Sequence, residues 1–262
     1  MDTVPREEPP PLEPIAMAAL QAGRVLMEAG ANAASVDRVI ALIARGLGAE
    51  QVDSRIGYAS LTANVRVGDS GITRMTRVGS LGVNHRLDER VWNLARRVSS
   101  RELTPEQTAA ELARLPSATP RHPLWVTAPA VGLACAAFGR LLAVDWYAIG
   151  AVLLASTLGQ FFRSKLLTHR MNVFLCTALV SCSSSVICGL AARWAHSQTV
   201  EMAMVASILL LIPGVPAMNA QTDILEGYPT LGSARLSIVA MTIVFIAAGL
   251  WFGRTIVVLI GG

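Results

Sequence analysis

The sequence predicts an α-helical multi-pass membrane protein, with about five transmembrane helices behind a small N-terminal cytoplasmic α+β domain. Two observations carry this prediction. Most charged residues lie before residue 121, whereas residues 121–262 are dominated by Ala, Val, Leu, Ile, Gly and Cys. Because the two parts differ in this way, a mean hydropathy of +0.49 coexists with a net charge of +4.

The N-terminal part begins with residues 1–13, which are acidic and rich in proline and which we expect to form a disordered lead. They lack the basic region followed by an apolar one that is typical of a signal peptide. We therefore expect the α+β domain that follows, residues 14–120, to stay in the cytoplasm.

Two amphipathic helices are expected at the start of this domain. Apolar residues recur at helical spacing from Ile15 to Ala29, where Gly30 provides a stop, and again over about 33–46. Two further helices are expected at its end. One covers about 88–99, and the other begins with a capping box at Thr104 to Gln107 and is closed by Pro116 and Pro120.

Between the two helix pairs the apolar residues change to a period of two. This alternation predicts strands at 61–67 and 72–78, and the residues 68–71 supply the turn between them. A further strand is expected near 51–58. The domain is therefore expected to contain a β-hairpin, with that further strand beside it.

The apolar half can be divided by length, because about 20 apolar residues cross the hydrocarbon core. The expected spans are 124–143, 147–162, 171–192, 199–219 and 235–254. One end of these spans carries more positive charge, on Arg121, Arg163, Lys165, Arg170 and Arg235. The other end carries Arg193, Arg254 and the acidic Asp145. The richer end is expected to face the cytoplasm, and an odd number of spans then places the C-terminus outside.

Small and hydroxyl side chains are placed to pack these spans together. Gly132 and Gly139 lie on one face of the first span, and Gly159 lies on the second. In the third span Ser181 and Ser184 belong to a hydroxyl-rich stripe. This stripe either packs against a neighbouring helix or lines a wet path.

Residues 212–223 interrupt the fourth span with Pro213, Gly214 and Pro216, and then turn polar. Each proline removes a backbone N–H and disturbs the preceding turn, so that backbone groups are freed where a bilayer has no water. In transporters a broken helix of this kind indicates a solute site. The alternative is a kinked helix end followed by a loop.

Several charged or polar residues are candidates for a transport pathway. Asn219 and Asp223 follow the break and are four positions apart, so both would project to one side if the helix resumes there. They either share a solute or a proton, or they cap a cytoplasmic loop. Arg140 and Arg254 lie in the outer ends of the first and fifth spans, where an unpaired charge is costly. Each either snorkels outward or lines a pathway, with Asp145 or a carboxylate-bearing cargo as its partner.

Enzymatic and nucleic-acid functions receive little support. A hydrolytic site would use Ser60, Asp69, His85 and Asp88, but no nucleophile motif or phosphate-binding loop accompanies them. The four cysteines lack metal-ligand spacing, and the arginines are scattered without aromatic residues between them. We therefore expect no catalytic residue, no metal or other cofactor and no nucleic-acid partner.

Several ordered motifs resemble those of one known family. They are Leu26-Met27-Glu28-Ala29-Gly30-Ala31, Val36-Asp37-Arg38, Thr73-Arg74-Met75-Thr76-Arg77-Val78, Gly82-Val83-Asn84-His85-Arg86-Leu87 and Pro213-Gly214-Val215-Pro216-Ala217-Met218-Asn219 with Asp223. In this order, over about residues 14–255, they resemble the threonine/serine exporter family. The resemblance implies a cytoplasmic domain followed by ten spans in two halves of five. This chain is similar to the larger subunit of a split, two-protein form.

The residues and the resemblance together predict a subunit of an exporter in the inner membrane, in contact with lipid. Its cargo is expected to be a small carboxylate-bearing metabolite, either threonine and serine or a dicarboxylate such as succinate. A second, small membrane subunit is expected to supply the other half of an inverted repeat. The alternative is a membrane-anchored hydrolase or sensor whose soluble domain carries the activity.

Overall fold

The computed structural model describes residues 12–120 and 122–261, and the chain divides into two compact units. The first unit combines Met1–Arg121 with Val215–Leu236, and the second combines His122–Gly214 with Ser237–Gly262. Residues 215–236 therefore pack with the N-terminal domain, although the sequence had assigned them to the membrane half. Most of the expected disordered lead lies outside the described residues, and its last two residues are helical.

Four helices form the N-terminal part of the first unit: α1 (Leu12–Glu28), α2 (Ala33–Gly46), α3 (His85–Ser99) and α4 (Pro105–Ala118). The Asn32 side chain caps α2 by accepting a hydrogen bond from the Ser35 amide. The capping box at Thr104 is present, as predicted. Pro116 does not close α4: it lies inside the helix, which continues to Ala118 although proline has no amide to donate to the preceding turn.

The three strands are β1 (Gln51–Ile56), β2 (Ser60–Val67) and β3 (Ser70–Arg77), and they form an antiparallel sheet in the order β1-β2-β3. Val67 pairs with Ser70, so the β2–β3 hairpin turns on two residues. Gly68 adopts a positive φ of 54° in this turn, which glycine does without strain. The predicted hairpin and the further strand beside it are confirmed.

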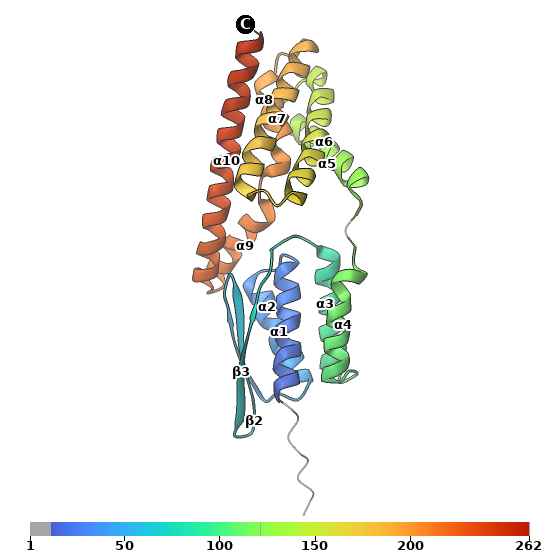
Figure 1. Cartoon of the computed structure of the whole chain (residues 1–262), viewed down its shortest axis with the longest axis vertical. Coiled ribbons are helices and arrows are strands. Elements are labelled where there is room, and N and C mark those ends of the chain that lie inside the picture. The colour runs from blue at the N-terminus through green and yellow to red at the C-terminus, as the bar shows by residue number, and fades with distance from the viewer. Residues whose placement is uncertain (1–11, 121, 262) are drawn as a thin grey trace, which may run out of the picture. The chain divides into compact units, whose positions relative to one another are not determined.

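The core of the first unit lies around α1 and α2. Figure 1 shows these two helices between the sheet on one side and the α3–α4 pair on the other. Leu61, Ala63 and Val65 of β2 are fully buried against them. Leu231, only 2% exposed, joins the same core from the C-terminal half of the chain.

The second unit contains α5 (Leu124–Leu141), α6 (Trp146–Thr168), α7 (Val173–Trp194), α8 (Val200–Ser207) and the short helix η1 (Leu209–Leu211). Two more helices follow, α9 (Gly214–Leu225) and α10 (Pro229–Gly261). The first unit takes nearly all of α9 and the first residues of α10, and the second unit takes the rest of α10.

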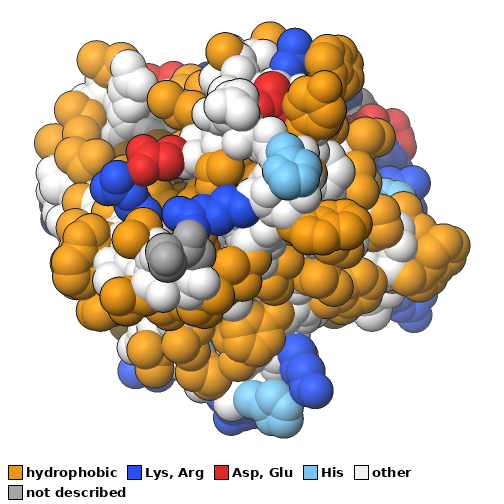
Figure 2. Space-filling model, turned by 90° about the horizontal axis from the view of Figure 1, so that it is seen from above, with side chains coloured by type: hydrophobic (Ala, Val, Ile, Leu, Met, Phe, Trp, Pro, Cys, Tyr) orange, Lys and Arg blue, Asp and Glu red, His pale blue; other side chains and the backbone are white. Residues whose placement is uncertain are grey.

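Three of these helices, α5, α7 and α10, are long and apolar enough to cross a membrane. The α8–η1 segment and α9 meet the same criterion only together, with a bend of 63° between them. The apolar windows of α5, α7 and α10 are 28%, 44% and 22% buried, so most of their apolar side chains face outward. Figure 2 shows many hydrophobic side chains exposed on one end of the molecule. By length and composition, the described residues therefore contain three candidate membrane spans, or four if the bent pair is one span.

Glycines allow the helices of the second unit to approach closely. A Cβ added at Gly132 would lie 2.8 Å from the Leu153 carbonyl of α6, and one at Gly159 would overlap the Ser184 hydroxyl of α7. In α10, Gly249 and Gly253 are four residues apart and face the Ala178 and Cys182 carbonyls of α7. The predicted packing through small residues is confirmed, and the glycine pair of α10 adds a contact that the sequence analysis had not identified.

Candidate functional site

The chain leaves regular helical geometry between Ser207 and Gly214. After α8 it forms the short turn η1, and Ile212 is extended, with φ −64° and ψ 122°. Pro213 has no amide to donate, and no atom lies within 4 Å of a Cβ placed at Gly214. Pro216 lies in the first turn of α9, where a proline costs no helical hydrogen bond. The predicted interruption of this segment is confirmed.

One backbone group near the break is satisfied by a neighbouring helix. The Ser207 carbonyl accepts a hydrogen bond of 3.0 Å from the Ser156 hydroxyl of α6, and both residues are fully buried. A freed carbonyl in an apolar interior needs such a donor.

The helix resumes in α9, and its two polar residues contact the loop that joins α1 to α2. The Asn219 side-chain amide donates a hydrogen bond of 2.6 Å to the Gly30 carbonyl. Asp223 Oδ1 accepts one of 2.7 Å from the amide of Ala33, the first residue of α2. Both residues therefore lie on one side of α9, as predicted, and Asp223 caps the N-terminus of α2.

The second carboxylate oxygen of Asp223 binds Arg235 in the second turn of α10. Arg235 Nη1 lies 2.6 Å from Asp223 Oδ2, and Arg235 Nη2 donates a hydrogen bond of 2.8 Å to the Ala31 carbonyl. The two side chains are 4% and 0% exposed. A solute or hydrated cation therefore has no access to Asp223 in this structure. We call the set Gly30, Ala31, Ala33, Asn219, Asp223 and Arg235 the clasp.

The loop 30–33 is held in shape by its own neighbours. Gly30 adopts a φ of +101°, and a Cβ there would lie 2.5 Å from the Gly82 carbonyl. The amides of Gly82 and Asn84 donate hydrogen bonds to the Glu28 and Ala29 carbonyls at the end of α1. Three of the motifs on which the family resemblance rests thus meet here, the ones that begin at Leu26, Gly82 and Pro213.

A second contact lies beside the clasp. The Tyr228 hydroxyl, in the turn between α9 and α10, donates a hydrogen bond of 3.2 Å to Asp37 of α2. The other oxygen of Asp37 accepts a hydrogen bond from the Ser54 hydroxyl of β1. Burial, followed by the nearby negative charge of Asp37, raises the pKa of Tyr228 above its ordinary value.

The serine candidates have different surroundings. The Ser181 hydroxyl donates a hydrogen bond of 2.8 Å to the Ile246 carbonyl of α10, so it joins two helices. The Ser184 hydroxyl is buried and has no hydrogen-bond partner. It points at Gly159 of α6, where the absence of a side chain makes room for it.

The two arginine candidates lie in different places in the second unit. Arg140 donates a hydrogen bond to the Val144 carbonyl and lies 4.3 Å from the ring centre of Trp146. It does not pair with Asp145, which instead accepts hydrogen bonds from Ser197, Gln198 and Ala148 at the α5–α6 and α7–α8 turns. Asp145, one of the two expected partners, is therefore not the partner of Arg140, since it caps α6.

Arg254 of α10 pairs with Glu201 of α8 at 2.7 Å. Both side chains are more than half exposed, at 59% and 71%. An exposed pair of this kind contributes little to stability.

The sequence analysis identified Asn219 and Asp223 but not Arg235 or the loop that receives them. Arg235 had been placed at the start of the fifth span and counted only for orientation. The available signal was a lone arginine near the start of a long apolar helix, twelve residues after a lone aspartate. A charge in such a position needs a partner, and the two charges are complementary.

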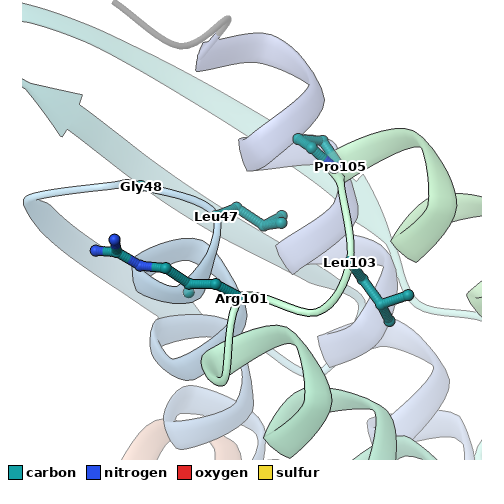
Figure 3. Close-up of a pocket in the computed structure, with 6 residues that line it drawn as sticks. Leu47, Gly48, Arg101, Leu103 and Pro105 are labelled. Atoms are coloured by element: carbon teal, nitrogen blue, oxygen red, sulfur yellow. The ribbon is translucent and has the colours of Figure 1, made fainter.

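The residues considered for hydrolysis are not assembled into a site. His85 and Asp88 both lie in the first turn of α3 and interact electrostatically. No group of three or more His, Cys, Asp or Glu residues among the described residues is placed to hold a metal. Figure 3 shows a hollow in the first unit, between the end of α2 and the α3–α4 loop. It is lined by Gly46, Leu47, Gly48, Arg101, Leu103 and Pro105, none of which is a nucleophile or a general base.

The comparison with protein families decides the relationship. Residues 17–257, including the break and the whole clasp, match the model of the ThrE family, described as "Putative threonine/serine exporter". The chain belongs to the threonine/serine exporter family. It is a member of a family of membrane exporters, and its apolar helices agree with that assignment.

Two curated relatives of this exporter cover most of its length. "Probable succinate transporter subunit YjjP" of Escherichia coli (strain K12) is 26% identical over 238 residues, which are 90% of this chain and 92% of the relative. The protein of the same name in Klebsiella aerogenes is 27% identical over 224 residues, 85% and 86% of the two chains. No solved structure matches the exporter.

Proposed function

We propose that this family member is one subunit of an inner-membrane exporter for small carboxylate-bearing metabolites. The cargo is threonine and serine, or a dicarboxylate such as succinate. The family match along residues 17–257 is the observation that carries the proposal, and the names of the relatives favour a dicarboxylate. With no nucleotide-binding motif in the sequence, the ion gradient is the source of energy.

A second membrane subunit completes the transporter in this proposal. The relatives are named subunits, and they match this chain over nearly their whole length. Two five-span halves in succession have opposite orientations, because an odd number of spans reverses the side of the membrane. Such a pair makes an inverted repeat, with the solute site where the halves meet.

The proposed topology has five spans, a cytoplasmic N-terminal domain and an external C-terminus. We include α6 as a span because its 23 residues are roughly 35 Å long and it packs on both α5 and α7. Its basic residues, Arg163 and Lys165, lie near its end, where they can snorkel. The α8–η1 segment is only about 18 Å long, so this crossing also needs the bend and part of α9.

The proposed pathway passes the break. Pro213, Gly214 and Pro216 shape the bend, and Ser181 and Ser184 lie on α7 beside the helices that frame it. Arg140 and Arg254 lie toward the other end of the helices, where a cargo carboxylate can meet a positive charge. Asn219 and Asp223 act through the clasp, because a direct contact of Asp223 with solute requires Arg235 to leave it.

Efflux from cells tests this function. Cells that lack their own exporters of these solutes receive this chain, the second subunit, or both, and the external succinate, threonine and serine are measured over time. We expect efflux of one of these solutes only when both chains are present. Equal efflux in all strains would reject the proposal.

A further inference from the structure

The clasp satisfies three polar backbone groups where α1 ends and α2 begins. The Gly30 and Ala31 carbonyls and the Ala33 amide are each bonded by a side chain from α9 or α10, at 2.6, 2.8 and 2.7 Å. Leu231, next to these contacts in α10, is packed into the core of the first unit. The N-terminal domain is therefore not a separate module on a tether, because two helices of the C-terminal half complete it.

The two helices held in this way continue directly into the membrane segments. α9 begins at Gly214, immediately after the break, and α10 runs from Pro229 to Gly261 without interruption. The division between the two units falls between Gly214 and Val215 and again between Leu236 and Ser237. No atom lies within 4 Å of a Cβ placed at Gly214, so neighbouring side chains do not enclose the backbone there.

The chemistry of the clasp is suited to a contact that opens and closes. A buried ion pair loses much of its Coulomb attraction to desolvation, and well-packed apolar residues would hold the same surfaces at least as firmly. An ion pair with hydrogen bonds instead specifies one geometry for the contact. Opening it exposes two charges that water solvates readily.

We propose that loop 30–33 is a positioning site of the exporter, which binds α9 and the start of α10 through the clasp and so fixes the position of α9, the helix that follows Pro213. The clasp loosens and re-forms in each transport cycle. This inference rests on the proposed function and adds to it that the cytoplasmic domain is a working part of transport. Asp223 and Arg235 are positioning residues, and neither touches the cargo.

Charge-neutral substitutions test the role of the pair. The complete two-subunit exporter is purified as the parent and as Arg235→Gln, Arg235→Lys and Asp223→Asn variants, and efflux from liposomes is normalised to folded protein. Arg97→Gln is the matched control. Arg97 also pairs with a carboxylate of the first unit, that of Glu111, but its side chain is exposed and this pair does not involve α9.

We expect roughly tenfold slower efflux per folded protein for Arg235→Gln and Asp223→Asn, a smaller loss for Arg235→Lys, and no loss for Arg97→Gln. Lysine keeps the charge but cannot bond Asp223 and Ala31 in the same fork geometry. Efflux of Arg235→Gln within about twofold of the parent, per folded protein, would overturn the proposal. So would a loss that disappears once folded protein is used for normalisation.

Hydrogen exchange of the amides of residues 31–33 gives a readout that a purely structural contact would not change. In the parent we expect the exchange rate to differ by about threefold between liposomes with and without a gradient of the transported solute. Equal rates under transport would contradict an opening clasp.

The two proposals fail differently. If the parent moves no succinate, threonine or serine, the proposed function is rejected. Hydrogen exchange measured without substrate then tests whether the clasp exists. Asp223→Ala should raise the exchange rate of the Ala33 amide by at least about tenfold. An unchanged rate would reject the clasp.

Discussion

Arg235 Nη1 and Asp223 Oδ2 lie 2.6 Å apart, and the two side chains are 4% and 0% exposed. The turn between α9 and α10 brings them together, with Gly227 at a φ of +90°. Asp223 Oδ1 accepts a hydrogen bond from the Ala33 amide, and Arg235 Nη2 donates one to the Ala31 carbonyl, so each side chain also bonds a residue 190 or more positions away in the sequence. The two charges therefore neutralise each other within the C-terminal half, and their further hydrogen bonds join that pair to the N-terminal domain.

Removal of either charge is predicted to destabilise the chain strongly. Asp223→Ala or Arg235→Ala leaves a buried unpaired charge, for which a loss of about 3–5 kcal/mol is expected. The double variant should lose clearly less than the sum of the two single losses. Unfolding in detergent, followed for all four proteins, measures this coupling, and additive losses would show that the pair does not act as a unit.

Leu231 is predicted to stabilise the N-terminal domain from outside its own sequence. Leu231→Ala removes a side chain that is 2% exposed in that core, so the free energy of unfolding should fall by about 2–5 kcal/mol. Leu236→Ala, on the same helix but 50% exposed, is the control and should have little effect. Hydrogen exchange of β2 amides reports on this core. Equal protection in the two variants would show that α10 is not part of it.

Most of the fold follows from local patterns in the sequence. Helical periodicity gave α1 and α2, Gly68 and Asp69 gave the β2–β3 turn, and the capping box at Thr104 gave the start of α4. Pro116 was misjudged because α4 continues through it to Ala118, although the proline cannot make the hydrogen bond of a helical amide. The boundary between the units could not be found, since apolar segments of a domain core and of a membrane span look alike.

Close packing of α10 on α7 is predicted to depend on the absence of a side chain at Gly249. A Cβ there would overlap the Ala178 carbonyl, and backbone cannot move aside as a side chain can. Gly249→Ala should therefore cost about 1–3 kcal/mol. Gly150→Ala is the control, because no atom lies within 4 Å of its added Cβ and alanine favours a helix. Thermal unfolding in detergent compares the two. A Gly249→Ala variant as stable as the control would contradict this helix contact.

Asp145 is predicted to make stability depend on acid pH. Burial acts to raise its pKa, but hydrogen bonds from Ser197, Ala148 and Gln198 outweigh burial and hold the pKa below the usual 3.8. A lowered folded-state pKa contributes stability above the unfolded value, and this contribution is lost as pH falls through the folded value. The unfolding temperature should thus drop below roughly pH 4, and less so in Asp145→Asn. The same acid dependence in both proteins would exclude Asp145 as its cause.

The site was predictable only in part. The proline break and the common side of Asn219 and Asp223 follow from residue types and helical spacing. Their partners do not, because a contact between residue 223 and residue 33 depends on how the two halves of the first unit pack. The same holds for Ser184. The serine stripe predicts that its hydroxyl lies inside the bundle, but the sequence does not show that this hydroxyl faces Gly159 of another helix and has no hydrogen-bond partner.

The central claim is that this chain exports a small carboxylate-bearing metabolite together with a second membrane subunit. Liposomes loaded with labelled succinate, threonine or serine test it, with this chain alone, the second subunit alone, or both in the membrane and an ion gradient imposed. The account predicts that one of these solutes leaves the liposomes only when both chains are present. Full efflux by this chain alone, or none by the pair for any of the three solutes, would contradict it.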